Sequence, residues 1–195
     1  MKLNNIHRRG SLLLLAVVAA AAVNAQTGDA FGKAVTNTNI TAEEVEAAQK
    51  AWGAALIQIS SDYKAGGFTK AKATAESVLD QAYGYNIGPV LFKPTLTSGN
   101  QVFRTTRQGA LAYFVGGDKE FPTDTGFALK GWEKYEFKNA AVFISGDMAI
   151  TMGNVMLTDA SGKVTTVDKT WGFKKDDKGN LRIVLHHSSL PYNPQ

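Results

Sequence analysis

Residues 164–189 read VTTVDKTWGFKKDDKGNLRIVLHHSS, in which two β-prone segments lie on either side of a run of turn residues. The segments 164–174 and 181–189 are rich in the β-branched, aromatic and other apolar side chains that strands favour. The sequence DDKGN at 176–180 carries the Asp, Gly and Asn residues that are typical of tight turns. This stretch therefore predicts a β-hairpin near the carboxyl end of the chain.

The preceding residues continue this pattern of short strands. Residues 141–145 and 148–158 flank Gly146 and Asp147, which is a second hairpin signal. Residues 132–137 alternate aromatic and charged side chains, as a strand with one buried face does. Further upstream, three more β-prone segments bounded by loops lie at residues 90–92, 101–106 and 110–115.

The residues before these strands have a helical pattern instead. Thr41 and Glu44 form a capping box, in which each side chain can bind a free backbone amide at a helix start. Apolar residues then recur at spacings of three and four, at Val45, Ala48, Trp52, Leu56, Ile59 and Tyr63. Gly66 and Gly67 end this helix, and a second helix is predicted over residues 69–82.

Helices followed by a long run of strands predict an α+β domain, with the amino-terminal helices packed on one face of a curved antiparallel sheet. A strongly bent sheet and its helices would enclose a cone whose open end forms a pocket suited to a small molecule. No repeat or linker interrupts residues 41–195, so we expect a single domain there. The composition, 44% hydrophobic and 19% charged in 195 residues, is ordinary for a globular protein.

Residues 1–25 have the features of an export signal. Three basic residues and no acid precede an apolar run over residues 12–23, which is short for a membrane span. The sequence Val-Asn-Ala at 23–25 suits a signal peptidase. We expect cleavage there, a loose polar lead-in over residues 26–40, and a periplasmic or secreted protein. An uncleaved amino-terminal anchor is the alternative.

The charge balance changes once this signal is removed. Of the 21 basic and 17 acidic residues, Lys2, Arg8 and Arg9 leave with the signal, so the net charge of +4 falls almost to zero. The basic isoelectric point is therefore no sign of a nucleic-acid partner, and we expect no membrane partner after cleavage. The lack of cysteine excludes disulfides and thiolate chemistry.

His186 and His187 are the only histidines outside the signal. Neighbouring residues on a strand point to opposite faces, so at most one of the two rings can enter a given pocket. A three-histidine zinc site within one subunit is therefore excluded, and no cysteine can replace a ligand. The carboxylates are scattered among turns. We predict no metal site and no cofactor.

The densest polar cluster, His186 to Ser189, ends an otherwise apolar strand. These side chains could form a polar pocket wall, or they could be a polar strand end whose serines bind their own backbone. A serine hydrolase is a poor reading, because Ser188 and His186 lie two residues apart on one strand and splay too far for a nucleophile–base hydrogen bond. No Gly-x-Ser-x-Gly elbow is present either.

Four more polar residues interrupt apolar segments. Tyr113 could turn its hydroxyl into a cavity or pack in the core. Thr95, which follows Pro94, could present its hydroxyl to a ligand or cap a turn. Arg104 and Arg107 could each hold an anion, although a solvated strand face is the commoner setting for such residues.

An ordered set of motifs connects these residues with a known family. The set comprises VLFKPT at 90–95, FR at 103–104, ALAYFVGG at 110–117, MGN at 152–154 and LHHSSLPY at 185–192. In this order the motifs resemble the iota-class carbonic anhydrases, over residues 41–192. The terminal strand also resembles that of the wider nuclear transport factor 2-like superfamily, which includes the calcium/calmodulin-dependent kinase association domain.

The resemblance implies a cone-shaped α+β fold, a homodimer, and the interconversion of carbon dioxide and bicarbonate. Some members of this family have been regarded as metal-dependent, while others of closely similar sequence are metal-free. The pocket residues of the metal-free type fall on Thr95, Tyr113, His186 and Ser188. Many bacterial members have three consecutive histidines before the two serines; here Leu185 takes the first place, which fits the metal-free type. Two alternatives stay open: a non-catalytic ligand-binding or oligomer-assembly module of the same superfamily, and another small-molecule enzyme that uses the same pocket.

Overall fold

The computed structural model describes residues 38–194. The predicted export signal at 1–25 and most of the predicted lead-in at 26–40 lie outside these residues. Within them a long helix is followed by one short strand, a second helix, a 3-10 turn and four long strands. This order confirms the predicted α+β class. In the described part of the chain, no helix has both the length and the apolar character that crossing a bilayer requires.

Helix α1, Ala42–Ala82, contains both of the predicted helices. The capping box is present: Thr41 N donates to Glu44 Oε2 at 2.9 Å, and Glu44 N donates to Thr41 Oγ1 at 3.2 Å. The chain leaves helical geometry at Gly67, where φ is 71° and ψ is −164°. This backbone conformation strains any residue with a β-carbon. The Gly66–Gly67 pair therefore divides α1 into two helical segments, as the sequence predicts.

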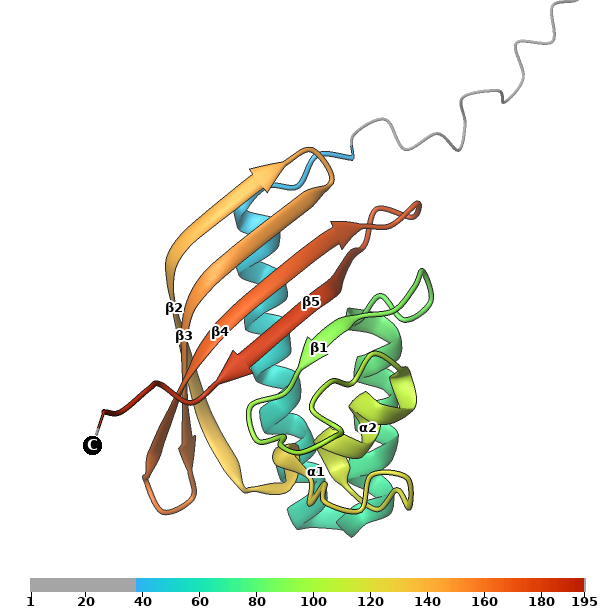
Figure 1. The fold of residues 1–195 in the computed structure, drawn as a ribbon, viewed down its shortest axis with the longest axis vertical. Helices are drawn as coiled ribbons and strands as arrows, with labels where there is room; N and C mark the ends of the chain where they lie inside the picture. Colours follow the sequence, from blue (N-terminus) through green and yellow to red (C-terminus); the bar gives the residue numbers. More distant parts are fainter. Residues whose placement is uncertain (1–37, 195) are drawn as a thin grey trace, which may run out of the picture. The chain divides into compact units, whose positions relative to one another are not determined.

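Five strands form one sheet in the order β1-β5-β4-β3-β2 (Figure 1). Their bounds are β1 Leu91–Lys93, β2 Trp132–Ser145, β3 Met148–Asp159, β4 Val164–Lys175 and β5 Leu181–Ser189. Strands β2 to β5 pair antiparallel, which confirms both predicted hairpins. Strand β1 instead pairs parallel with β5, with Phe92 opposite His186. The sheet is therefore mixed, because the long connection after β1 allows a parallel pairing that a hairpin would not.

Two of the three strands predicted upstream are wrong. Residues 101–106 form no strand, and residues 110–115 belong to helix α2, Arg107–Val115. The Thr106 side chain caps the start of α2, and Gly116 ends it with φ at 68°. A short apolar run such as ALAYFV cannot be assigned to strand or helix by its periodicity. The capping residues Thr106 and Gly116 are the sequence signals that favour a helix over a strand at these residues.

A buried amide network joins α1 to an irregularity in β2. The two β-prone segments predicted over 132–145 form one continuous strand, whose pairing with β3 shifts between Asn139 and Ala141. Gln49 of α1 and Asn139 exchange two hydrogen bonds of 2.9 Å. Gln49 also donates to Thr151 Oγ1 of β3 at 3.2 Å. These contacts satisfy the buried amides and fix α1 against the sheet.

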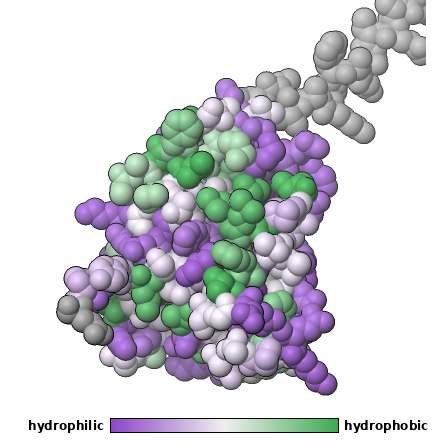
Figure 2. Space-filling view, in the orientation of Figure 1, coloured by the Kyte–Doolittle hydropathy of each residue, from purple (hydrophilic) through white to green (hydrophobic). Residues whose placement is uncertain are grey.

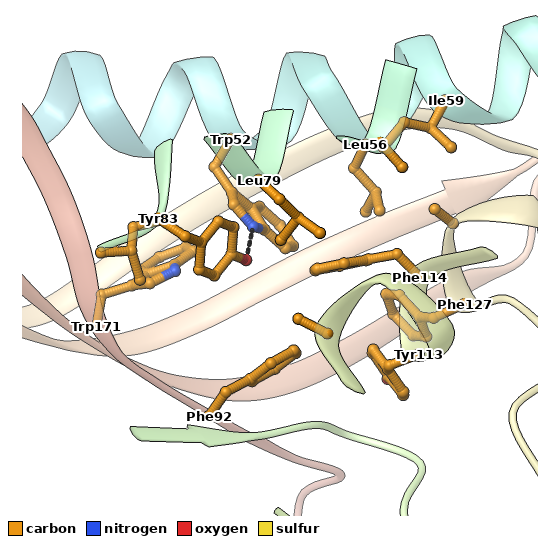
Figure 3. Packing of buried hydrophobic residues seen from close by; sticks show 14 of the residues in the cluster. Trp52, Leu56, Ile59, Leu79, Tyr83, Phe92, Tyr113, Phe114, Phe127 and Trp171 are labelled. Atoms are coloured by element: carbon orange, nitrogen blue, oxygen red, sulfur yellow. Dashed lines mark hydrogen bonds between the residues drawn. The ribbon is translucent and has the colours of Figure 1, made fainter. Parts of the chain in front are cut away.

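The hydrophobic core lies between the sheet and the two helices. Figure 1 shows α1 running behind the strands, and α2 beside β1. Trp52 of α1 meets Trp171 of β4 edge to face, with ring centroids 5.5 Å apart. Figure 3 shows Phe92, Phe114 and Tyr113 in the same cluster. The aromatic residues that the sequence places on four different elements thus share one core, into which polar groups of β4 and β5 also point.

Candidate active site

The fold places the four predicted site residues on three elements. Thr95 lies in the turn after β1, Tyr113 lies on α2, and His186 and Ser188 lie on β5. The parallel pairing sets Lys93 of β1 opposite His187, so the chain after β1 runs beside Ser188. Tyr113 therefore reaches this region from a helix and not, as the sequence predicts, from a strand.

Three hydroxyl groups meet where β1, α2 and β5 converge. Thr95 Oγ1 and Ser188 Oγ form a hydrogen bond in which either can be the donor. Tyr113 Oη lies near the Thr95 hydroxyl and the backbone of Leu96, and burial raises the pKa of Tyr113 above its usual value. Tyr113 therefore keeps its proton at neutral pH. We refer to Thr95, Tyr113 and Ser188 as the hydroxyl cluster.

The Tyr113 hydroxyl is unusual because it is buried without a hydrogen bond. Tyr113 is only 5% exposed. Within residues 38–194, Tyr113 Oη and Trp171 Nε1 are the buried side-chain polar atoms that lack a partner. A buried hydroxyl usually has a partner, because leaving it unpaired costs about 1–3 kcal/mol. An unpaired hydroxyl beside two others is a feature expected of a ligand-binding site.

His186 points into the core, whereas its neighbour His187 is exposed. His186 is 2% exposed, and its ring lies 4.2 Å from that of Phe92, centroid to centroid. Its Nδ1 lies 2.8 Å from Tyr83 Oη, and its Nε2 contacts Lys169 Nζ. Burial holds the pKa of His186 well below its usual value. This ring is therefore neutral at neutral pH, with both nitrogens occupied.

Sequence reasoning missed three residues of this site: Trp52, Tyr83 and Lys169. Trp52 Nε1 donates to Tyr83 Oη at 3.0 Å, the bond drawn as a dashed line in Figure 3. Tyr83 caps the end of α1, so its place beside β5 depends on packing that no local pattern encodes. Lys169 did leave a signal, because it shares the inward side of β4 with Val167 and Trp171 at a spacing of two.

Phe92 lies between the hydroxyl cluster and His186. Its ring centroid is 5.7 Å from that of Tyr113 and 4.2 Å from that of His186. Tyr113 also stacks on Phe127, at 5.4 Å. The hydroxyl cluster thus has aromatic walls. Such an arrangement can hold a small ligand that is apolar as a whole and has oxygen atoms able to accept hydrogen bonds.

The two candidate anion-binding arginines are engaged elsewhere. Arg104 is 1% exposed and donates from Nη2 to both carboxylate oxygens of Asp124 at 3.0 Å. The expectation that Arg104 lies on a solvated strand face is therefore wrong, because the residue is buried and belongs to no strand. Arg107 pairs with Asp80 of α1, with Nε 2.6 Å from Oδ1. The Arg104 guanidinium connects two loops and that of Arg107 connects α2 to α1, so both have structural partners without a ligand.

In the described part of the chain, no three His, Cys, Asp or Glu side chains are grouped so that they could hold a metal ion. A hollow of about 230 Å³ between α1 and the sheet is lined by apolar residues that include Trp52, Phe173 and Ile183. The hydroxyl cluster is not part of its lining. The pocket expected at the open end of a cone stays a prediction.

Solved structures show which class of protein has this architecture. An iota-carbonic anhydrase from a cyanobacterium, in complex with bicarbonate, matches with a TM-score of 0.81 and 64% identity, over 82% of this chain and 98% of that one. A putative calcium/calmodulin dependent protein kinase II association domain from Xanthomonas campestris matches with a TM-score of 0.50 and 24% identity, over 83% and 96%. The second likeness shows the fold alone.

Sequence comparisons narrow the class to a family. A metal-independent carbonic anhydrase from Nostoc sp. (strain PCC 7120) is 65% identical over 158 residues, which are 81% of this chain and 77% of the relative. The family model described as metal-independent carbonic anhydrase (MICAH) matches residues 43–190. This chain belongs to the metal-independent carbonic anhydrase family.

Proposed function

We propose that the hydroxyl cluster of Thr95, Tyr113 and Ser188 is the site at which this metal-independent carbonic anhydrase hydrates carbon dioxide and binds bicarbonate. The observation that carries this assignment is the buried Tyr113 Oη, which has no partner within residues 38–194. The cyanobacterial relative with 64% identity is a complex with bicarbonate, a ligand whose oxygens can accept hydrogen bonds from such hydroxyls.

The number of protons in the hydroxyl cluster supports this assignment. Three hydroxyls carry three protons, and the bond between Thr95 and Ser188 uses one of them. The other two, one of them on Tyr113, remain available as donors. Negative charge develops on the oxygens of carbon dioxide as water attacks its carbon, and oriented donors stabilise that charge. Because the pKa of Tyr113 is raised, its hydroxyl stays a donor rather than becoming a phenolate.

The aromatic walls of the hydroxyl cluster suit the apolar character of carbon dioxide. Carbon dioxide is apolar, so the rings of Phe92 and Phe127 beside Tyr113 can hold it by burial and dispersion. His186 supports this site from behind Phe92, since both of its ring nitrogens are engaged by Tyr83 and Lys169. We therefore assign His186 a positioning role in the site. Without zinc to lower the pKa of water to about 7, turnover should be slower than in the fastest zinc enzymes.

Stopped-flow hydration of carbon dioxide tests the site. Tyr113→Phe removes only the hydroxyl and should lower kcat/KM by about 100-fold, in the range found for lost oxyanion donors. Tyr135→Phe is the control, because Tyr135 Oη donates to the Lys50 carbonyl on the surface. Bicarbonate should also raise the melting temperature of the wild type, through binding linkage. A Tyr113→Phe variant with wild-type activity would show that the reaction uses another site.

We also propose that the protein acts after export, in the periplasm or outside the cell. The basic start and the apolar run of residues 1–25 support this proposal. Amino-terminal sequencing of the protein recovered from the periplasm and from the medium would test it. A new amino terminus at Gln26 is expected, and an intact Met1 in the cytoplasmic fraction would contradict it.

We further propose a homodimer formed through the outer face of the sheet. Phe143 and Ile150 are cross-strand partners on β2 and β3, and with Met152 they are 68%, 43% and 61% exposed. Figure 2 shows apolar surface, in green, among polar residues on the sheet face that looks away from α1. Exposed apolar clusters often mark interfaces. Sedimentation should give a dimer that Phe143→Lys weakens, and a monomeric wild type would contradict the proposal.

A further inference from the structure

Lys169 is a buried lysine without an acidic partner. It is 4% exposed, and its Nζ forms no ion pair with any residue of 38–194. Its neighbours are the ring of Trp52 at 4.4 Å, the ring of Trp171 at 5.1 Å, and Nε2 of His186. Burial holds the pKa of Lys169 well below its usual value. Lysines are almost never fully buried unless they are paired, and a buried lysine whose pKa is lowered can act as a general base.

A chain of hydrogen bonds runs from Trp52 through Tyr83 and His186 to Lys169, and the donors and acceptors available to it determine its direction. Trp52 Nε1 can only donate, so Tyr83 Oη accepts from it. Tyr83 can then donate its own proton to His186 Nδ1, which leaves the proton of the neutral ring on Nε2. That proton can be donated to Lys169 only if Nζ is an uncharged amine with a free lone pair. The complete chain therefore requires a neutral Lys169.

A charged Lys169 would reverse the donors and acceptors in the hydrogen bonds between Lys169, His186 and Tyr83. An ammonium donates to His186 Nε2, which moves the ring proton to Nδ1 and makes that nitrogen a donor to Tyr83 Oη. The aromatic faces of Trp52 and Trp171 can stabilise the cation. Both protonation states are thus accommodated, and they differ in the tautomer of His186.

The position of Lys169 connects this chain with the hydroxyl cluster. Lys169 and Ser188 are directly opposite each other on β4 and β5. Both are buried, so their side chains leave the sheet on the same face. Within residues 38–194, the titratable side chains that contact the lysine or its hydrogen-bond partners include His186 from β5, Tyr83 at the end of α1, and Tyr85, which stacks on Tyr83. Across the other edge of β4, Lys169 is opposite Gly153 of β3, which has no side chain.

We propose that Lys169 is the proton acceptor of the reaction, and this inference rests on the function proposed for the hydroxyl cluster. In hydration, a bond forms between the water oxygen and the carbon of carbon dioxide, and one O–H bond of that water breaks. The released proton passes by way of Ser188 to Lys169 Nζ, whose lone pair becomes free when its hydrogen bond from His186 Nε2–H breaks and the ring changes to the Nδ1–H tautomer. Bicarbonate and an ammonium are formed together, so the buried site stays neutral as a whole. The ammonium then returns its proton to solvent.

Two activity measurements test this role. Lys169→Met keeps the length and apolar packing of the side chain but cannot take a proton. It should lower kcat for hydration by at least about 100-fold with little change in KM, and added imidazole should restore part of the rate. Lys169→Arg should not restore it, because an arginine stays charged. Lys174→Met, at a half-exposed lysine of the same strand that pairs with Asp147, is the matched control.

A spectroscopic readout separates this role from a structural one. In a chain carrying His7→Gln and His187→Gln, His186 is the only histidine. Its ¹⁵N spectrum should change from the Nε2–H to the Nδ1–H tautomer as the pH falls and Lys169 takes up a proton. The kcat for hydration should fall over the same pH range. In Lys169→Met the coupled change should be absent.

The outcomes distinguish this inference from the function on which it rests. Wild-type kcat and an unchanged pH profile in Lys169→Met would overturn the role of Lys169 and leave the hydroxyl cluster in place. An Nδ1–H tautomer at every pH would also overturn it, because Lys169 would then be charged throughout. A wild type that does not hydrate carbon dioxide would overturn the proposed function, and this role with it.

Discussion

Tyr83 Oη lies 2.8 Å from His186 Nδ1, although 103 residues separate the two in the chain. Tyr83 is the cap of α1, and its backbone forms a bridge with Ile183 of β5. The end of the long helix is thus tied to the strand that carries His186 and Ser188. This contact explains how a helix on one face of the sheet orients the His186 ring, which supports the hydroxyl cluster from behind Phe92.

Tyr83→Phe tests the structural value of this contact. The substitution leaves Trp52 Nε1 and His186 Nδ1 without their buried partner. We expect the free energy of unfolding in urea to fall by about 2–4 kcal/mol, because two buried polar groups lose their hydrogen bond. Tyr85→Phe, which removes a hydrogen bond to the Arg104 carbonyl, should cost only about 1 kcal/mol. Equal losses of unfolding free energy in Tyr83→Phe and Tyr85→Phe would contradict the hydrogen bonds that link Trp52, Tyr83 and His186.

Ser188→Ala and Ser189→Ala form a matched pair on neighbouring positions of β5. The Ser188 hydroxyl contacts Thr95, whereas Ser189 lies on the opposite side of the strand. Ser188→Ala should lower kcat/KM for hydration by about 10–100-fold, since it removes one donor of the hydroxyl cluster. Ser189→Ala should leave it within about twofold. A comparable loss in Ser189→Ala would indicate a general effect on β5.

His186 should make the protein sensitive to acid. The unfolded chain protonates this ring near pH 6.5, whereas the folded pKa is well below that value because the ring is buried. The contribution to stability is therefore complete above about pH 6.5 and is lost as the pH falls, by up to about 1.4 kcal/mol per pH unit. His186→Asn should reduce this slope in urea unfolding below pH 6.5, and His187→Asn should not. The same slope in all three proteins would contradict the assignment.

The buried pair of Arg104 and Asp124 should be structural and not part of the anion site. Arg104→Met leaves Asp124 buried without a partner and should cost about 3–5 kcal/mol of stability. The double variant with Asp124→Leu should recover most of that loss. Arg107→Met, which breaks a more exposed pair, should cost at most about 1 kcal/mol. A double variant as unstable as Arg104→Met would show that the pair stabilises the fold beyond compensating the two buried charges.

The hairpins and the long helix could be predicted because their signals are local. The capping box at Thr41, the break at Gly67 and the turns after β2 and β4 each depend on a few adjacent residues. Helix α2 could not be assigned in the same way, because residues 110–115 are apolar on every side and both sides are needed in the core. The parallel pairing of β1 also depends on a contact far along the chain.

The hydroxyl cluster proposed as the site contains residues that the sequence analysis named, but the side chains that support it were missed. Thr95, Tyr113, His186 and Ser188 were identified through the family resemblance, whereas residue types alone favoured a polar strand end for the cluster from His186 to Ser189. Lys169 could have been found, since alternation along β4 places it on the buried side. Trp52 and Tyr83 read as ordinary core aromatics, because their mutual hydrogen bond exists only after α1 packs on the sheet.

Carbon dioxide hydration by exhaustively chelated protein, followed by stopped flow with the metal content assayed on the same sample, tests the central claim most directly. We expect the metal-free wild type to keep its activity and Tyr113→Phe to lose most of it, because the hydroxyl cluster supplies the donors. Activity that disappears on chelation and returns with one added metal would contradict a reaction carried by these side chains.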